Sequence, residues 1–261
     1  NDNDLLPMKR GPKWKSRIPL LYIENKVVEL RKSGLNRYEI TSILKPKLKQ
    51  FTPSPSGVYN IIKRYNLNKL SIKMKANKRK IIKNKAGDLA HIDCHYLSKD
   101  IVSNIKEQLF LIAIIDDCSR VVWVEIIPNL KSLTAMFATI RILNHFRQTY
   151  QIEFKELLSD NGAEFGGKNI KHPEEHPFER LLIETGIKHR YTRPYRPQTN
   201  GKIERFWKII ESDLLEDMVF DSMNHLQDEL SQYLYYYNNL RPHQGINGEN
   251  PVSFLKNLST N

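Results

Sequence analysis

At 261 residues the chain is long enough for one large domain and a smaller one, and its 40% hydrophobic residues can build a core. The longest apolar run, around residues 110–115, is far shorter than the roughly 20 residues of a membrane-spanning helix. The two cysteines, Cys94 and Cys118, form no paired metal or redox motif, so we expect a reducing, cytoplasmic compartment and no disulfide.

Positive charge is concentrated near the N-terminus. Residues 1–90 hold 22 lysines and arginines against 6 acidic residues, whereas residues 91–261 hold 19 against 23. This skew favours an arm that binds nucleic acid, as in a nucleoid-associated protein, over an ordinary solvated lysine-rich surface. We expect a basic tail at 1–23, whose first residues look like the start of a fragment, and a basic linker at 71–88 that could track a DNA backbone.

Residues 24–70 are predicted to form a small all-α domain. An apolar stripe from Val27 should end at Ser33-Gly34, and Asn36 with Glu39 resembles a capping box for a second helix that Pro46 should break. Ser54-Pro55 should begin a third helix that buries Val58, Ile61, Ile62 and Tyr65. Its opposite face suits a DNA groove, and a helix-turn-helix is favoured over a generic three-helix bundle. The side chains on that face are Ser56, Tyr59, Asn60, Lys63 and Arg64.

From residue 89 to 220 strand and helix patterns alternate. Strands are predicted at 89–97, 109–115, 121–127, 154–158 and 188–191, and helices at 132–150, 178–185 and 201–215. A helical segment at 221–261 follows. The order favours an α/β fold with a mixed sheet flanked by helices.

Three acidic residues occupy special places in this pattern. Asp93 lies in mid-strand, Asp160 follows an apolar strand, and Glu204 lies in the first turn of a helix. Converging carboxylates suit Mg²⁺ or Mn²⁺, and a pair of such ions serves phosphodiester chemistry. Each acid also has an explanation that involves no metal. Asp93 could be a buried acid with hydrogen-bond partners, Asp160 a turn residue, and Glu204 a charge favoured by the helix dipole.

The motifs around these acids closely resemble the integrase-type core of insertion-sequence transposases, related to retroviral integrases. They are Asp93 in its strand, Ser159-Asp160-Asn161-Gly162-Ala163-Glu164-Phe165, and the stretch from Pro197 to Phe206 that reads Pro-Gln-Thr-Asn-Gly-Lys-Ile-Glu-Arg-Phe. The stretch from Tyr237 to Gln244, followed by Asn250-Pro251, looks like the family's closing segment. The resemblance spans about residues 24–255.

That resemblance implies an RNase H-like catalytic core in which Asp93, Asp160 and Glu204 bind the metal, with two Mg²⁺ or Mn²⁺ ions expected. It implies a DDE-type polynucleotidyl transferase that cleaves at transposon ends and joins the 3′-hydroxyl to target DNA. The expected partners are double-stranded DNA, both terminal repeats and target, and further copies of the chain. Residues 166–176 look like an insertion of uncertain role.

Other polar residues near the acids have competing interpretations. Lys202, Arg205 and Lys208 would contact phosphates or form helix salt bridges; Asn161, Arg193 and Arg196 are further DNA-contact candidates. Asp116 and Asp117 rival the triad as ligands, but turn chemistry explains both. His91 and His95, on the Asp93 face, are expected to be structural or to support the ligands.

Two other functions compete with transposition. An inert, domesticated DNA-binding regulator would keep the fold, although the intact triad argues against it. A nuclease for RNA–DNA hybrids is disfavoured by the helix-turn-helix and the basic N-terminal region.

Overall fold

The computed structural model describes residues 19–68, 83–167, 170–192, 200–216 and 218–259. The chain divides into two compact units, residues 1–74 and 75–261, each described by itself. In the described segments, no helix has both the length and the apolar character to cross a membrane. The predicted tail lies mostly outside the described residues, and of the predicted linker only residues 83–88 are described.

The first unit is built from three helices: α1 (Leu21–Lys32), α2 (Arg37–Leu48) and α3 (Pro55–Arg64). A short 3₁₀ turn, η2 (Lys49–Phe51), follows α2. Apolar side chains from all three helices form its core: Val27, Ile40, Leu44, Val58, Ile61 and Ile62. The predicted all-α N-terminal region is therefore present.

Local signals at the helix ends are confirmed in detail. Asn36 and Glu39 form a reciprocal capping box at the start of α2, and the Ser54 hydroxyl accepts a hydrogen bond from Gly57 N. The prediction that Pro46 breaks the second helix is wrong, because α2 continues through it to Leu48 and Pro46 falls in the last turn. Tyr65 was also wrongly assigned to the core, since it follows the last residue of α3 and is 40% exposed.

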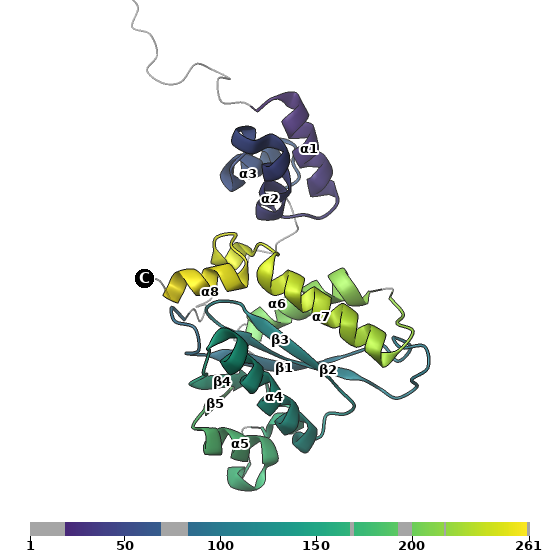
Figure 1. Ribbon diagram of the computed structural model, residues 1–261, viewed down its shortest axis with the longest axis vertical. Helices are drawn as coiled ribbons and strands as arrows, with labels where there is room; N and C mark the ends of the chain where they lie inside the picture. Colours follow the sequence, from purple (N-terminus) through teal and green to yellow (C-terminus); the bar gives the residue numbers. More distant parts are fainter. Residues whose placement is uncertain (1–18, 69–82, 168–169, 193–199, 217, 260–261) are drawn as a thin grey trace, which may run out of the picture. The chain divides into compact units, whose positions relative to one another are not determined.

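The second unit contains a five-stranded sheet in the order β3-β2-β1-β4-β5 (Figure 1). β1, β2 and β3 pair antiparallel, whereas β1, β4 and β5 run parallel to one another. The strands are β1 (Ala90–Tyr96), β2 (Phe110–Asp116), β3 (Val122–Ile127), β4 (Glu156–Ser159) and β5 (Lys188–Tyr191). The mixed sheet confirms the predicted fold class.

Helices cover both faces of the sheet. On one face, α4 (Ser132–Tyr150) and α5 (Pro177–Thr185) pack through Ile142, Phe146 and Phe178. On the other, α6 (Gly201–Ile210) and α7 (Met223–Asn239) pack through residues such as Phe206 and Leu234. The described C-terminal residues therefore join the core of this unit; the last helix is α8 (Pro251–Ser259).

Two predicted boundaries in this unit differ from the structure by more than one residue. β4 begins at Glu156, because Phe154 packs into the core from the loop before the strand. The helix predicted to reach residue 215 is α-helical only to Ile210 and continues as one π-helical turn, η6 (Glu211–Leu215). Short 3₁₀ turns are η3 (Ala163–Phe165), η4 (Pro173–Glu175) and η7 (Gln244–Ile246).

Candidate active site

Asp93 lies in the middle of β1, opposite Ala113 of β2. Ile92 packs into the core on the α4 side of the sheet, so alternation along the strand turns Asp93 toward α6. There its carboxylate accepts a hydrogen bond from Trp207 Nε1 at 3.0 Å. The predicted two-residue alternation thus places Asp93 on the same face as the helix that carries Glu204.

Asp160 follows the last residue of β4. The parallel pairing of His91 with Leu158 would bring Asp93 beside Asp160 two residues further along each strand. The Asp160 carboxylate accepts a hydrogen bond from Gly162 N at 2.8 Å, so the residue also closes its own turn. Glu164, in η3, is a further acid nearby: burial first, then the charge of Asp160, raises the pKa of its carboxyl.

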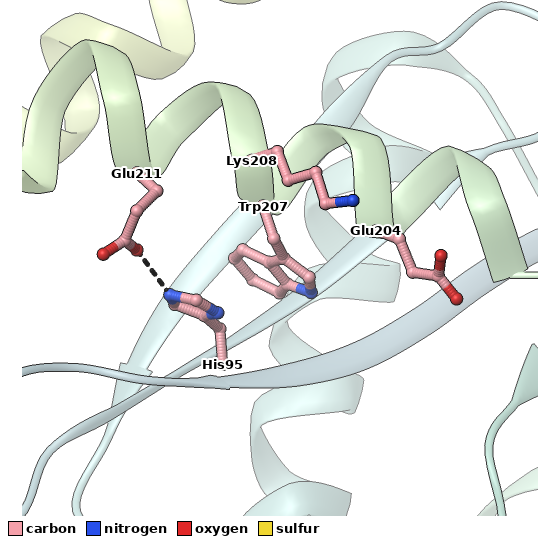
Figure 2. Close-up of a pocket in the computed structure, with 5 residues that line it drawn as sticks. All are labelled: His95, Glu204, Trp207, Lys208 and Glu211. Atoms are coloured by element: carbon pink, nitrogen blue, oxygen red, sulfur yellow. Dashed lines mark hydrogen bonds and ion pairs between the residues drawn. The ribbon is translucent and has the colours of Figure 1, made fainter. Parts of the chain in front are cut away.

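Glu204 projects from the first turn of α6. The buried residues Ile203, Phe206 and Ile210 hold one face of this helix on the sheet, leaving Glu204 and Lys208 exposed. Figure 2 shows these two side chains in an open pocket that His95, Trp207 and Glu211 also line. His95 stacks on Trp207, with ring centroids 5.0 Å apart, and its Nε2 is 2.7 Å from Glu211.

The carboxylates of Asp160 and Glu204 both act on Asp93. Burial, and then the negative charge of Asp160, raises the pKa of the Asp93 carboxyl to about 7. The hydrogen bond from Trp207 lowers this pKa in part, and the charge of Glu204 raises it by a smaller amount. Three carboxylates that repel each other are a suitable donor set for hard cations such as Mg²⁺. Within the described part of the chain, however, no three acidic, histidine or cysteine side chains lie close enough to hold an ion together. Ion binding would require movement of the exposed Asp160 and Glu204 side chains.

Asp116 and Asp117, the rival acids, have different roles. Asp116 behaves as predicted: its carboxylate accepts hydrogen bonds from Ser119 N and Oγ within the turn. Turn chemistry does not explain Asp117. Its buried carboxylate accepts hydrogen bonds from His91 Nε2 at 2.8 Å and from the Lys202 ammonium, because the turn lies against the start of α6. His91 and His95 are thus held by protein partners, as expected of structural groups.

A second polar network, missed from the sequence, lies behind Asp160. Nε2 of His189, in β5, lies 2.9 Å from Ser159 Oγ, and Nδ1 of the same ring lies 2.9 Å from the Glu179 carboxylate. Tyr191 donates a hydrogen bond to that carboxylate. Although this arrangement resembles a serine-hydrolase relay, Ser159 is fully buried, and its hydroxyl donates to the Asp160 carbonyl. We therefore assign it a structural role.

The residues predicted to contact DNA are distributed over both units. Five side chains of α3 are exposed: Ser56, Tyr59, Asn60, Lys63 and Arg64. Arg64, however, forms an ion pair with Glu24 at 2.7 Å. Arg37 lies over the ring of Tyr59, 5.9 Å from its centroid.

In the second unit the predicted contacts differ in accessibility. Arg205 and Lys208 are exposed on α6, whereas Lys202 is half-buried and pairs with Asp117. Asn161 is exposed, and its amide donates to the Thr192 carbonyl at 3.2 Å. Arg193 and Arg196 lie outside the described residues. Cys94 and Cys118, both in described segments, are free as predicted.

Comparison with known families agrees with this architecture. Two models described as "Integrase core domain" match residues 84–197 and 185–251, together more than half of the chain. The chain belongs to the integrase core family. The matched residues contain all three acids and extend from the region just before β1 to the first residue of α8.

Relatives of this integrase core come from a virus and from mobile elements. The chain is 27% identical over 177 residues to the ORF3 protein of Spiroplasma virus SpV1-C74, which is named as a proposed integrase. That match covers 66% of this chain and 48% of the viral protein. The transposase of insertion sequence IS904 from Lactococcus lactis is 28% identical over 80 residues, covering 30% of this chain and 32% of the transposase. The chain thus spans about half or less of the length of these relatives.

Among solved structures, the simian T-cell lymphotropic virus intasome has a similar fold. The likeness covers 88% of this chain and 74% of the matched chain, with a TM-score of 0.51 and 13% identity. At this identity it supports the fold alone.

Proposed function

We propose that this protein is a DDE-type transposase that cleaves DNA at the ends of its element and joins the freed 3′-hydroxyl to target DNA. The observation that supports this most directly is the placement of three acids on neighbouring elements: Asp93 of β1 faces α6, Asp160 follows the parallel neighbour β4, and Glu204 lies in the first turn of α6. Family membership supports the same class of reaction.

In this proposal the three acids would hold two Mg²⁺ or Mn²⁺ ions. When bound, such a pair activates the attacking oxygen and stabilises the leaving oxygen of a phosphodiester. The rest of the chain orients the ligands: Trp207 donates to Asp93, and the backbone NH of Gly162 donates to Asp160. In the first step water attacks the phosphodiester at the element's end, and the P–O bond to the 3′-oxygen of the element strand breaks to leave a free 3′-hydroxyl and a 5′-phosphate. In the second step that hydroxyl attacks a target phosphodiester, and the 3′-oxygen of the target strand leaves. Neither step requires a covalent protein–DNA intermediate.

DNA would be bound by both units. The exposed face of α3 suits the terminal repeats, with Lys63 contacting phosphate and Ser56, Tyr59 and Asn60 available to base edges. Lys208 runs along α6 toward Glu204 in Figure 2, a place from which its ammonium would contact a phosphate near the scissile bond. Pairing two DNA ends also requires two sets of these surfaces, so we propose a homo-oligomer in the active complex.

The test replaces each acid singly, as Asp93→Asn, Asp160→Asn and Glu204→Gln, and measures end cleavage and strand transfer on labelled duplex ends with Mg²⁺ or Mn²⁺. Each variant should lose both steps and keep DNA binding, because the loss removes a metal ligand and not a DNA contact. Glu164→Gln is the matched control, since it neutralises a neighbouring acid outside the triad and should retain activity.

Three results would contradict this proposal in different ways. Activity retained in one triad variant would remove that residue from the site. Binding of terminal repeats by the wild type without Mn²⁺ uptake or product would instead identify an inert DNA-binding regulator. Preferential cutting of RNA–DNA hybrids over duplex ends would indicate a hybrid nuclease.

A further inference from the structure

A buried polar network joins the β2–β3 turn to the first turn of α6. Its centre is Asp117, whose side chain is 0% exposed. The carboxylate accepts hydrogen bonds from His91 Nε2 at 2.8 Å, from the backbone N of Lys83 at 2.7 Å and from the ammonium of Lys202. Lys202 also donates to the Asp117 carbonyl at 3.0 Å, so two acceptors hold this one ammonium.

The network reaches α6 a second time through Asn200. This residue immediately precedes the helix, and its Oδ1 lies 3.1 Å from His91 Nδ1. Asparagine at this position commonly caps the first turn of a helix. Among the described residues, the Asn200 side chain forms no such cap. Its amide is used to connect α6 to β1 instead.

Together these contacts hold the turn that carries Glu204 at two positions before that residue. Asn200 and Lys202 precede Glu204 by four and two residues, and both are bound to groups on the sheet side of the helix. Glu204 itself is exposed. Its direction therefore depends on where the backbone of this turn is held.

The charges in this network are well satisfied. Burial alone would raise the pKa of the Asp117 carboxyl, but the hydrogen bonds from His91, Lys202 and Lys83 outweigh burial and lower it to about 2. A buried charge pair seldom adds much stability compared with apolar packing, yet removing one partner leaves the other uncompensated. Such a pair is better suited to holding one arrangement than to adding stability.

We propose that Asp117 is a positioning residue that, through Lys202 and the His91–Asn200 contact, holds the first turn of α6 so that Glu204 is directed toward the metal site. This inference rests on the proposed function, because it assigns Asp117 a task within that site. Outer residues that orient metal ligands typically change metal affinity by about 10- to 100-fold when removed.

The decisive comparison is Asp117→Asn against Asp116→Asn. The two acids are adjacent and fully buried, but the hydrogen bonds of Asp116 run to Ser119 and to Gly87 N. We expect Asp117→Asn to raise the Mn²⁺ concentration needed for half-maximal strand transfer by about 10-fold or more. Excess Mn²⁺ should recover much of the activity, and Asp116→Asn should leave the requirement near that of the wild type. Equal requirements in the two variants would overturn the proposal.

Two further measurements keep the test decisive. If Asp117→Asn does not fold, His91→Gln removes the imidazole that joins Asp117 to Asn200 and leaves the pair of Asp117 with Lys202 in place. It should raise the Mn²⁺ requirement in the same direction, and an unchanged requirement would contradict the proposal. Amide hydrogen exchange at residues 204–207 should be faster in Asp117→Asn than in Asp116→Asn, and equal rates would also contradict it. Because exchange needs no metal, it still tests the positioning role if the wild type proves inactive, a result that would refute the proposed function alone.

Discussion

At the scale of single residues, buried polar groups near α6 and α7 each have specific hydrogen-bonding or packing partners. The Asp93 carboxylate accepts a hydrogen bond from Trp207, and the Asp117 carboxylate accepts hydrogen bonds from His91 and Lys202. His243, after α7, is buried against Tyr237, with ring centroids 4.5 Å apart. Burial first, and then the positive charge of Arg241, lowers the pKa of His243 from 6.5 to about 3.

The lowered pKa of His243 predicts a loss of stability in acid. The unfolded chain takes up a proton near pH 6.5 while the folded protein keeps the imidazole neutral, so the contribution of His243 is complete above that pH. It should decline as pH falls from 6.5 toward 3, by up to about 1.4 kcal/mol per pH unit. Urea unfolding between pH 7 and 5 would measure this decline. His243→Gln should flatten the pH dependence, and an unchanged slope would show that another group causes it.

At the scale of elements, α3 has one buried and one exposed face, and neighbouring basic residues on it differ in their surroundings. Lys63 is exposed, whereas Arg64 pairs with Glu24, a residue only 6% exposed, and Tyr65 donates to the same carboxylate. Two consecutive cations of one helix therefore have different expected functions.

Substituting these two cations separately should distinguish DNA contact from structural pairing. Lys63→Ala should weaken binding to duplex DNA about equally for all sequences and reduce the dependence of log K on log salt by about 1, with an unchanged melting temperature. Arg64→Ala should mainly lower the melting temperature of the first unit, because it leaves the buried Glu24 carboxylate without its ion-pair partner. Filter binding across a salt series and thermal unfolding would measure the two effects. Identical behaviour of the two variants would argue against this division.

At the scale of the whole molecule, each unit has cores made from its own residues. The first unit packs α1, α2 and α3 around Ile40 and Ile61. The second packs helices on both faces of the sheet, around Ile112 and Phe206. Residues 1–74 hold 16 lysines and arginines against 5 acidic residues, whereas residues 75–261, which contain the three acids, hold 25 against 24. DNA affinity and phosphodiester chemistry are therefore expected to be separable.

Residues 75–261 alone should fold cooperatively, because both of their apolar clusters stay complete. Their binding to duplex DNA should be weaker and less dependent on salt than that of the full chain, since each lost phosphate contact removes about 0.9 from the slope of log K against log salt. Amide NMR spectra and binding across a salt series would test both expectations. A full-length Asp93→Asn protein, expected to bind like the wild type, is the control.

The sequence by itself determined the elements and the places of the three acids. The helix at 132–150 and the strand at 188–191 follow from local periodicity and turn residues, and match α4 and β5. Asp93, Asp160 and Glu204 each lie at a recognisable point of an element, but they are selected through the resemblance of the motifs around them to the integrase-type core.

Only the tertiary structure decided which distant side chains meet. No local pattern in the sequence indicates that Trp207 of α6 donates a hydrogen bond to Asp93, which lies 114 positions away along the chain. Asp117 is read as a turn residue, and becomes the centre of a network only because the β2–β3 turn lies against α6. The predicted acid site therefore acquires its supporting residues from packing, because local patterns specify elements and do not specify the contacts between them.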